Sequence, residues 1–446
     1  MSSTASSSSL FHRSLEKSYP TAVRGKGVYL RTADGKEIFD GSSGAAVSSL
    51  GHGNDEVIDA ICEQARGLAF AHSSFFTSDP AEELARLILE KSNGAFAKVL
   101  FLTSGSEAVE SALKLARQYH IYNGEPQRVN FVGRQYSYHG NTLGALAAGN
   151  NTARRAPFAP ILAPVFHHVR RCFYPGDGKN QSEDAYEDQL LAEYEAEFNR
   201  IGANTIAAVI VEPFVGATLG SAPPTKTYLP RLSQLCKKYG ILTIFDEVMC
   251  GMGRTGSYHA WDGLGGVAPD LQTIGKGLGA GYQPLSAVLL GQTVYDVFQE
   301  HSKGSQAFLS GHTFQGHSMA CAGALAVQKI LFRDGLLLNC KKTGDILLDA
   351  LQQGLPPAFA ENGGSLRGAG LFRTVDFGDM GKSLGGPLAK EISTKAFELG
   401  AAVYLCSPAV DAILICPPFI MTEEETRRLA AIFLAAVDAV VGGRKA

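Results

Sequence analysis

A lysine and an aspartate, each next to an apolar run, are the residues of this sequence best suited to covalent chemistry. Asp246 ends the run 241–245, and Lys276 follows the run 271–274 in a glycine-rich segment. A lysine amine can form a Schiff base with an aldehyde, and a carboxylate can keep a ring nitrogen protonated, which is the pair that pyridoxal phosphate requires. Once released by substrate, Lys276 can act as a general base. The spacing alone also allows a strand cap at Asp246 and a solvated turn at Lys276.

The apolar runs predict the elements that hold this pair. The run 241–245 has the length and β-branching of a buried strand, and 271–274 predicts a second, shorter strand. Ligands of open α/β sheets bind outside the carboxyl ends of the strands. The sequence therefore predicts Asp246 and Lys276 at one edge of such a sheet.

A third strand, 99–103, leads into a possible phosphate site. Ser104 and Glu107 have the spacing of a capping box, which predicts a helix that begins at Gly105 and Ser106. The first turn of a helix presents free N–H groups and the positive end of the helix dipole to an anion. A plain capped helix with no ligand is the alternative.

The stretch from Phe245 to Gly281 resembles the signature of the class III pyridoxal-phosphate aminotransferases, the family of omega-amino acid, 4-aminobutyrate, ornithine and amine transaminases. Its Asp-Glu-Val (246–248), Gly-Arg-Thr-Gly (253–256) and Lys-Gly (276–277) elements match in order and spacing. The resemblance covers nearly the whole chain, from about residue 10 to about residue 440. It implies an α/β fold of the aspartate aminotransferase type (PLP fold type I), with a large domain of mainly parallel mixed sheet and a small α+β domain.

The resemblance also implies a role for each matching residue. In the family the lysine anchors pyridoxal 5'-phosphate and shuttles a proton, the aspartate binds the pyridine nitrogen, a valine and an aromatic side chain cover the ring, and a Ser-Gly-Ser element holds the phosphate. A threonine reaches the phosphate of the neighbouring subunit, which implies a homodimer with shared active sites. The residues of this chain at those positions are Lys276, Asp246, Val248, Tyr138, Gly105, Ser106 and Thr313, with Glu212 as a further possible cofactor neighbour.

Two departures from the family concern the substrate. Met249 stands where 4-aminobutyrate-type members carry glutamine, which indicates a less polar pocket. The loop 404–413 has no arginine, although many relatives use one there to bind a substrate carboxylate. Other side chains must supply that contact if it exists. The remaining candidates are three arginines, Arg24, Arg170 and Arg171, and three weak pocket residues, Ser48, Ser49 and Leu50.

The expected reaction is ping-pong transfer of an amino group from an amine or an omega- or alpha-amino acid to a 2-oxo acid. An aminomutase, a racemase or a decarboxylating transaminase would use the same residues, because pocket geometry decides the outcome. The sequence also leaves open a catalytically silent binding relative and a lysine-dependent aldolase without pyridoxal phosphate. The intact Asp246 and Lys276 argue against the silent relative, and the phosphate seat argues against the aldolase.

Composition limits the partners and the cellular location that the sequence predicts. The 446 residues, 45% hydrophobic and 19% charged with a formal net charge of −3, describe a globular chain without an electrostatic reason to bind nucleic acid or membrane. Eight cysteines without a Cys-x-x-Cys pair predict reduced thiols and a cytoplasmic location. His312 and His317 lack further ligands, so no metal site is expected. The apolar run 429–437 is too short to span a bilayer and predicts a buried helix.

The predicted division has four parts. Residues 1–18 form a flexible tip, 19–75 the N-terminal part of the small domain, 76–334 the large cofactor domain, and 335–446 the C-terminal part of the small domain. A hairpin around Asp34-Gly35 falls in the second part, and Thr422 with Glu425 is expected to cap the last helix.

Overall fold

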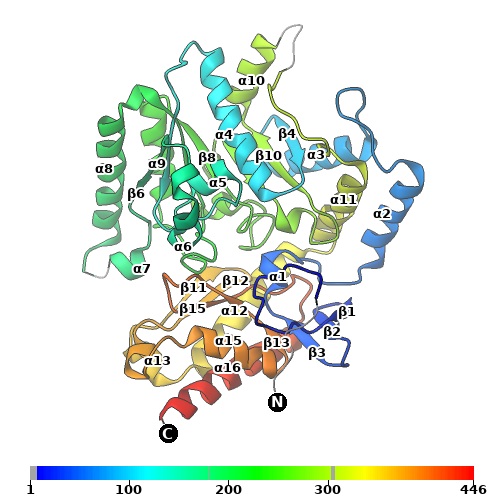
Figure 1. Cartoon of the computed structure of the whole chain (residues 1–446), viewed down its shortest axis with the longest axis vertical. Coiled ribbons are helices and arrows are strands. Elements are labelled where there is room, and N and C mark those ends of the chain that lie inside the picture. The colour runs from blue at the N-terminus through cyan, green and yellow to red at the C-terminus, as the bar shows by residue number, and fades with distance from the viewer. Residues whose placement is uncertain (1–7, 179, 303–306, 446) are drawn as a thin grey trace.

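A computed structural model describes residues 8–445 apart from 179 and 303–306. A seven-stranded sheet forms the centre of the upper body in Figure 1, with helices on both of its faces. Across the sheet the strands are β4 (Lys98–Leu102), β10 (Ser286–Leu290), β9 (Leu271–Ile274), β8 (Leu242–Asp246), β7 (Ile206–Val211), β5 (Asn130–Arg134) and β6 (Phe166–Val169).

The sheet is parallel except for β10. This strand pairs antiparallel with β4 on one side and with β9 on the other, so β4 and β9 run in the same direction. The remaining neighbours all pair in parallel. The carboxyl ends of β4, β5, β7, β8 and β9 therefore lie along one edge. The expected mainly parallel mixed sheet is confirmed, and β9 has the predicted bounds.

Burial explains why these strands appear in the sequence as apolar runs. All six residues of β7 and all five of β8 are buried, because helices cover both faces of the sheet. One of them, α4, packs across β10, β9 and β7. The helices of the upper body are α2 (Asp55–Gly67), α3 (Asp79–Lys91), α4 (Gly105–Tyr122), α5 (Leu143–Ala148), α6 (Thr152–Arg155), α7 (Tyr174–Asp177), α8 (Glu183–Ile201), α9 (Tyr228–Lys238), α10 (Gln292–His301) and α11 (Ser318–Arg333).

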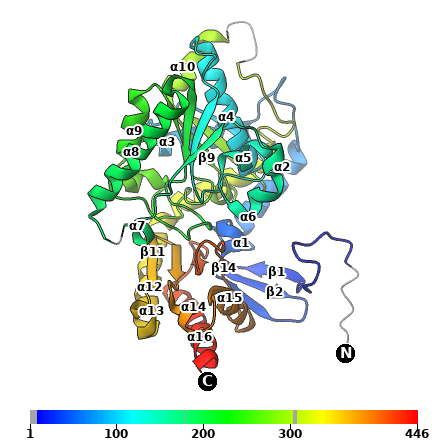
Figure 2. The ribbon, with the colours of Figure 1, turned by 60° about the vertical axis from the view of Figure 1, so that its left-hand side comes forward.

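The lower body combines both ends of the chain, as Figures 1 and 2 show by the blue strands beside the orange and red elements. Strand β3 (Glu37–Asp40) pairs in parallel with β13 (Ala401–Ala402), so one sheet contains segments more than half the chain apart. The hairpin around Asp34-Gly35 joins β2 (Tyr29–Thr32) to β3, and β1 (Ala22–Lys26) adds a third strand. The domain boundaries at 18, 75 and 334 remain predictions, and the first seven residues of the expected tip lie outside the described residues.

A second four-stranded sheet completes the lower body. Its order is β11 (Ser365–Ala369), β12 (Phe372–Asp376), β15 (Ala412–Ile415) and β14 (Tyr404–Leu405). The last helix, α16 (Glu423–Lys445), begins at the expected capping box: Thr422 Oγ1 accepts from Glu425 N at 3.2 Å, and Glu425 Oε2 accepts from Thr422 N at 2.8 Å. The other helices here are α1 (Ser43–Ala46), α12 (Leu336–Gly354), α13 (Pro357–Glu361), α14 (Met380–Ser383) and α15 (Ala389–Glu398).

None of the helices in the described part of the chain is both long and apolar enough to cross a membrane. The run 429–437 lies in α16, where Leu429, Phe433 and Val437 are fully buried at helical spacing.

Candidate active site

A cavity of about 770 Å³ lies where the carboxyl ends of the parallel strands meet the lower body. Five segments that each follow a different strand contribute to its wall, which is the arrangement that the strand directions dictate. The residues predicted for the site that line it are Gly105 and Ser106 after β4, Tyr138 after β5, Glu212 after β7, Asp246 and Val248 at and after β8, and Lys276 after β9.

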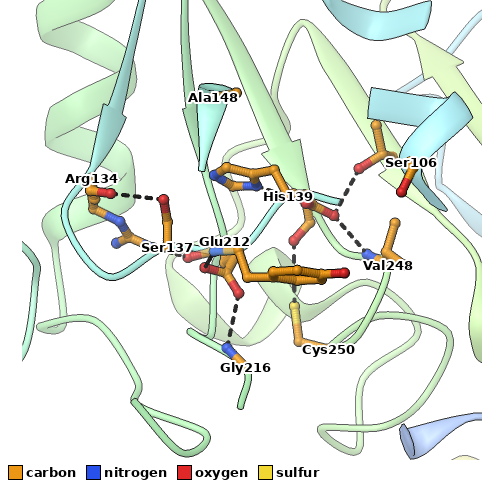
Figure 3. Close-up of polar contacts among 12 residues, drawn as sticks. Ser106, Arg134, Ser137, His139, Ala148, Glu212, Gly216, Val248 and Cys250 are labelled. Atoms are coloured by element: carbon orange, nitrogen blue, oxygen red, sulfur yellow. Dashed lines mark hydrogen bonds and ion pairs between the residues drawn. The ribbon is translucent and has the colours of Figure 1, made fainter. Parts of the chain in front are cut away.

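Asp246 is held by three hydrogen bonds. Its Oδ1 accepts from Val248 N at 3.1 Å and from Thr273 Oγ1 at 2.9 Å, and its Oδ2 lies 2.8 Å from Nδ1 of His139. Figure 3 labels two of these three partners, His139 and Val248. Asp246 is only 5% exposed, so these three donors, rather than water, fix the orientation of its carboxylate. The buried Nε2 of His139 has no hydrogen-bond partner among the described residues.

Lys276 begins a short 3-10 helix, Lys276–Leu278, directly after β9. Its φ is +43°, in the left-handed region that a side chain with a Cβ adopts at a cost of about 1–3 kcal/mol. Burial lowers the pKa of the Lys276 ammonium group, and the Asp246 carboxylate opposes that effect. A lysine with a lowered pKa is neutral in a larger fraction of molecules at a given pH, and the neutral amine is the nucleophile and base.

The helix α4 begins with the expected capping box. Ser104 Oγ accepts from Glu107 N at 3.2 Å, and Glu107 Oε2 accepts from Ser104 N at 3.1 Å. The N–H groups of Gly105 and Ser106 have no acceptor within the helix and lie at the cavity wall. Ser106 Oγ accepts a hydrogen bond from Asn141 N at 3.0 Å, so its own hydrogen remains to be donated. An anion seated here would receive donors from both backbone and hydroxyl.

Two glycines at this end of the cavity are required by close approach. A Cβ at Gly105 would lie 2.7 Å from Cγ1 of Val248. A Cβ at Gly140, whose φ is +137°, would lie 2.6 Å from Oγ of Ser106. The loop after β5 and the segment after β8 therefore press against the start of α4 with no space for a side chain.

A hydrogen bond joins Tyr138 to Glu212. Tyr138 N donates to Oε2 of Glu212 at 3.2 Å, and Gly216 N donates to Oε1 at 3.0 Å, as Figure 3 shows for Gly216. Burial raises the pKa of the Glu212 carboxyl, with the neighbouring Asp246 carboxylate acting in the same direction. The pKa of the Tyr138 hydroxyl is also raised by burial. Glu212 thus positions the backbone beside Tyr138 as well as lining the cavity.

Glu247, the middle residue of the Asp-Glu-Val element, faces away from the cavity. Its two carboxylate oxygens accept from the backbone N–H groups of Ala260 at 2.8 Å and Trp261 at 2.9 Å, where a 3-10 helix (Ala260–Leu264) begins. Burial raises its pKa to about 8. Glu247 is a structural acceptor.

Several residues predicted for the site do not line the cavity. Thr313 is exposed in the loop before α11 and does not line the cavity within its own chain, so its role across a subunit boundary remains a prediction. Arg170 pairs with Glu193 at 3.0 Å, and Arg171 forms two hydrogen bonds with Asp177, at 2.9 and 2.8 Å. Neither these arginines nor four other candidates line the cavity: Arg24, Ser48, Ser49 and Leu50.

Sequence reasoning missed other residues of the cavity wall. Arg154, from α6, and Arg13, from the N-terminal segment, both line it. Ala45 and Val47 also line it, whereas the nearby residues 48–50 were expected to do so. One short helix, α5, separates Arg154 from Tyr138 in sequence, and that nearness was an available signal. Nothing in the pattern around Arg13 distinguishes it from other surface arginines. Among the described residues, no group of three metal-binding side chains comes together.

Comparison with known proteins agrees with this geometry. A sequence profile described as aminotransferase class-III matches residues 12–437. The chain is 37% identical over 443 residues to an uncharacterized aminotransferase of Schizosaccharomyces pombe, covering 97% of this chain and 95% of that relative. It is 31% identical over 434 residues to the diaminobutyrate–2-oxoglutarate transaminase of Halomonas elongata, covering 93% and 89%.

A solved structure, the omega transaminase from Pseudomonas jessenii in complex with PMP, superposes with a TM-score of 0.89 at 29% identity and covers 96% of this chain and 94% of that one. A match of this extent includes both bodies of the fold. The chain belongs to the class III aminotransferases, pyridoxal-phosphate-dependent enzymes that move an amino group from an amine or amino acid to a 2-oxo acid.

Proposed function

We propose that this chain performs amino-group transfer with pyridoxal 5'-phosphate bound in the cavity at the carboxyl edge of the seven-stranded sheet. The observation that carries the proposal is the meeting, in one cavity, of a lysine with a lowered pKa, a fixed buried carboxylate and an open helix N-terminus. Each comes from a different strand end, and each matches one part of the cofactor.

The residues present fit the cofactor. The N–H groups of Gly105 and Ser106 and the hydroxyl of Ser106 supply donors for a phosphate. Tyr138 and Val248 both line the cavity and supply an aromatic and a branched aliphatic surface for a flat ring. Asp246, fixed by its three hydrogen bonds, supplies a carboxylate for the ring nitrogen.

When bound, pyridoxal phosphate supplies an electron sink and carries the amino group between the two half-reactions. The Nζ of Lys276 would hold the cofactor and, when released, would move a proton between the substrate Cα and a carbon of the cofactor. Asp246 would keep the ring nitrogen protonated, and His139 holds the Asp246 carboxylate in place. Glu212 fixes the backbone of Tyr138 and so the point from which the Tyr138 side chain projects.

The proposed assembly is a homodimer with shared active sites, in which Thr313 contributes to the phosphate seat of the partner subunit. Exposed aromatic side chains near Thr313 support this: Phe314 is 52% exposed, and Phe75 is 80% exposed on the neighbouring loop. Phe70 joins them through an edge contact with Phe314, with ring centroids 5.8 Å apart. We also propose a cytoplasmic location, since all eight cysteines are free thiols and seven of them are buried.

Spectroscopy of the purified protein with a panel of amines, amino acids and 2-oxo acids tests the cofactor role. We expect a visible cofactor absorbance band that one donor bleaches and one 2-oxo acid restores. Lys276→Ala should fold and bind the cofactor without turning over, whereas a control at the exposed Lys226, Lys226→Ala, should behave as the unmodified protein. A protein that cannot be reconstituted with pyridoxal phosphate, or a Lys276→Ala variant with full turnover, would refute the proposal.

Subunit complementation tests the shared site. Lys276→Ala and Thr313→Ala are each expected to have low activity. A mixed dimer of the two contains one site with both native residues if Thr313 acts across the interface, so mixing and re-equilibration should restore activity. Failure of the mixture to exceed the two separate variants would place Thr313 outside the partner's site.

A further inference from the structure

A substrate that brings a carboxylate into this cavity needs a positively charged side chain to bind that carboxylate. Both half-reactions involve carboxylate-bearing compounds if the donor is an amino acid and the acceptor a 2-oxo acid, and a buried carboxylate requires a charged partner. Of the described residues that line the cavity, those with positive side chains are Arg13, Arg154 and Lys276. Lys276 is committed to the reaction, so the two arginines remain.

We propose that Arg154 binds the substrate carboxylate, so that the substrates are amino acids and 2-oxo acids in preference to plain amines and aldehydes. This inference rests on the proposed function and adds the residue that sets its substrate class. Nothing in the aminotransferase reaction itself requires this particular arginine.

The position of Arg154 carries the proposal. Its guanidinium lies over the ring of Tyr138, with the Cζ atom 5.1 Å from the ring centroid. Nη1 makes a long contact of 3.5 Å with Oδ1 of Asn141. No carboxylate among the described residues forms an ion pair with it. A guanidinium that stacks on an aromatic face keeps its in-plane N–H groups available, and these form the fork that matches a carboxylate.

The other charges at the cavity are already engaged. Asp246 is held by His139 and two further donors, and the Glu212 carboxylate accepts from two backbone N–H groups. The arginines considered from the sequence, Arg170 and Arg171, are paired with carboxylates outside the cavity. Arg154 is therefore a cation at the wall with unused donor capacity.

The cofactor phosphate is the other anion that Arg154 could bind, because Asn141 also contacts Ser106. The start of α4 already offers the phosphate two N–H groups, a hydroxyl and the helix dipole. The substrate carboxylate has no comparable set of donors from α4. The geometry therefore favours the substrate, and binding measurements separate the two anions.

The experiment compares two acceptors that differ only in the carboxylate. Acetaldehyde is pyruvate with its carboxylate replaced by hydrogen, so kcat/KM is measured for both with the unmodified holoenzyme, Arg154→Gln, Arg154→Lys and Arg155→Gln. Arg155 is the matched control, because it belongs to the same short helix but does not line the cavity. The dissociation constant of pyridoxal phosphate is measured on each cofactor-free protein, and thermal unfolding reports whether each variant is folded.

Arg154→Gln should lower kcat/KM for pyruvate by about tenfold to a hundredfold, the range expected for a hydrogen-bonded charge pair. The value for acetaldehyde and the dissociation constant of pyridoxal phosphate should change by less than about twofold. Arg154→Lys should recover part of the loss, because it keeps the charge without the fork. Arg155→Gln should leave all three quantities unchanged.

Two results would overturn the proposal. Weaker binding of pyridoxal phosphate with an equal loss for both acceptors would assign Arg154 to the cofactor phosphate. An unchanged ratio of the pyruvate to the acetaldehyde kcat/KM, together with an unchanged dissociation constant of pyridoxal phosphate in a folded variant, would show that Arg154 contacts neither anion and would leave Arg13 as the remaining cation of the wall. A lack of transamination by the unmodified holoenzyme would refute the proposed function itself, and that result is distinct from both.

Discussion

Replacement of Gly105 by alanine tests whether the cavity is shaped by the contact between α4 and the segment after β8. The added methyl group would lie 2.7 Å from Cγ1 and 3.2 Å from Cγ2 of Val248. Ordinary carbon contacts are about 3.5–4.0 Å, so Val248 must move by close to 1 Å or α4 must shift. Val248 has little freedom, because its N–H is bonded to Asp246 and a Cβ built at Gly275 would contact its Cγ1 at 3.4 Å.

The most direct response is displacement of Val248 into the space proposed for the cofactor ring. Overpacking of this kind costs about 1–3 kcal/mol. If this free energy is lost from cofactor binding, the dissociation constant of pyridoxal phosphate rises by roughly fivefold to a hundredfold. If it is lost from the free energy of unfolding, the cofactor-free protein unfolds at a lower temperature. Fluorescence titration with pyridoxal phosphate and thermal unfolding of the cofactor-free protein distinguish the two.

Two further variants make this prediction specific. Val248→Ala in the Gly105→Ala background removes both clashing methyl groups, so the double variant should be less impaired than the sum of the two single changes. Gly67→Ala is the control, because Gly67 ends α2 and has open space around its Cβ position. A Gly105→Ala protein with unchanged cofactor affinity and unchanged thermal stability would refute the argument, as would strictly additive effects in the double variant.

Three other predictions concern groups around the cavity. His139→Asn should lower kcat by about tenfold or more and shift the pH dependence of kcat, because the replacement does not reproduce the bond to Asp246. Glu247→Ala should instead lower the free energy of unfolding by about 1–3 kcal/mol, measured by denaturant titration, because two buried N–H groups lose their acceptor. Burial lowers the pKa of His259 to about 3, so the unfolded state binds the proton first as the pH falls below about 6.5. This group should cost about 2 kcal/mol of stability at about pH 5, and the unfolding temperature of His259→Gln should fall less between about pH 7.5 and pH 5.

Sequence reasoning located the residues that stand at strand ends. Asp246, Lys276 and Gly105 were found because an apolar run that stops at a polar or glycine-rich segment marks a strand end, and parallel strands bring their carboxyl ends to one edge. The capping boxes at α4 and α16 were found for the same local reason, since both partners lie within one turn.

Contacts between distant segments could not be read in this way. The bond between His139 and Asp246 joins residues more than a hundred positions apart, and no local pattern distinguishes a histidine that orients a carboxylate from one that only fills space. The positions of Arg13 and Arg154 depend on how the N-terminal segment and α6 pack, so their place at the cavity wall required the structure. Glu247 lies beside Asp246 in sequence but faces the opposite way, as successive residues of an extended segment do.

At Lys276, whose backbone is left-handed, the proposed activity and the stability of the fold favour different residues. A glycine at φ +43° avoids most of the strain that a lysine incurs, and an asparagine avoids part of it. The amine of this lysine is also buried, and burial disfavours its charged form. Stability alone would therefore favour a glycine over a lysine at this position. The same reasoning sets a limit on engineering: substitutions that make this turn more stable remove the lysine proposed to hold the cofactor, so gains in thermal stability must come from the rest of the fold.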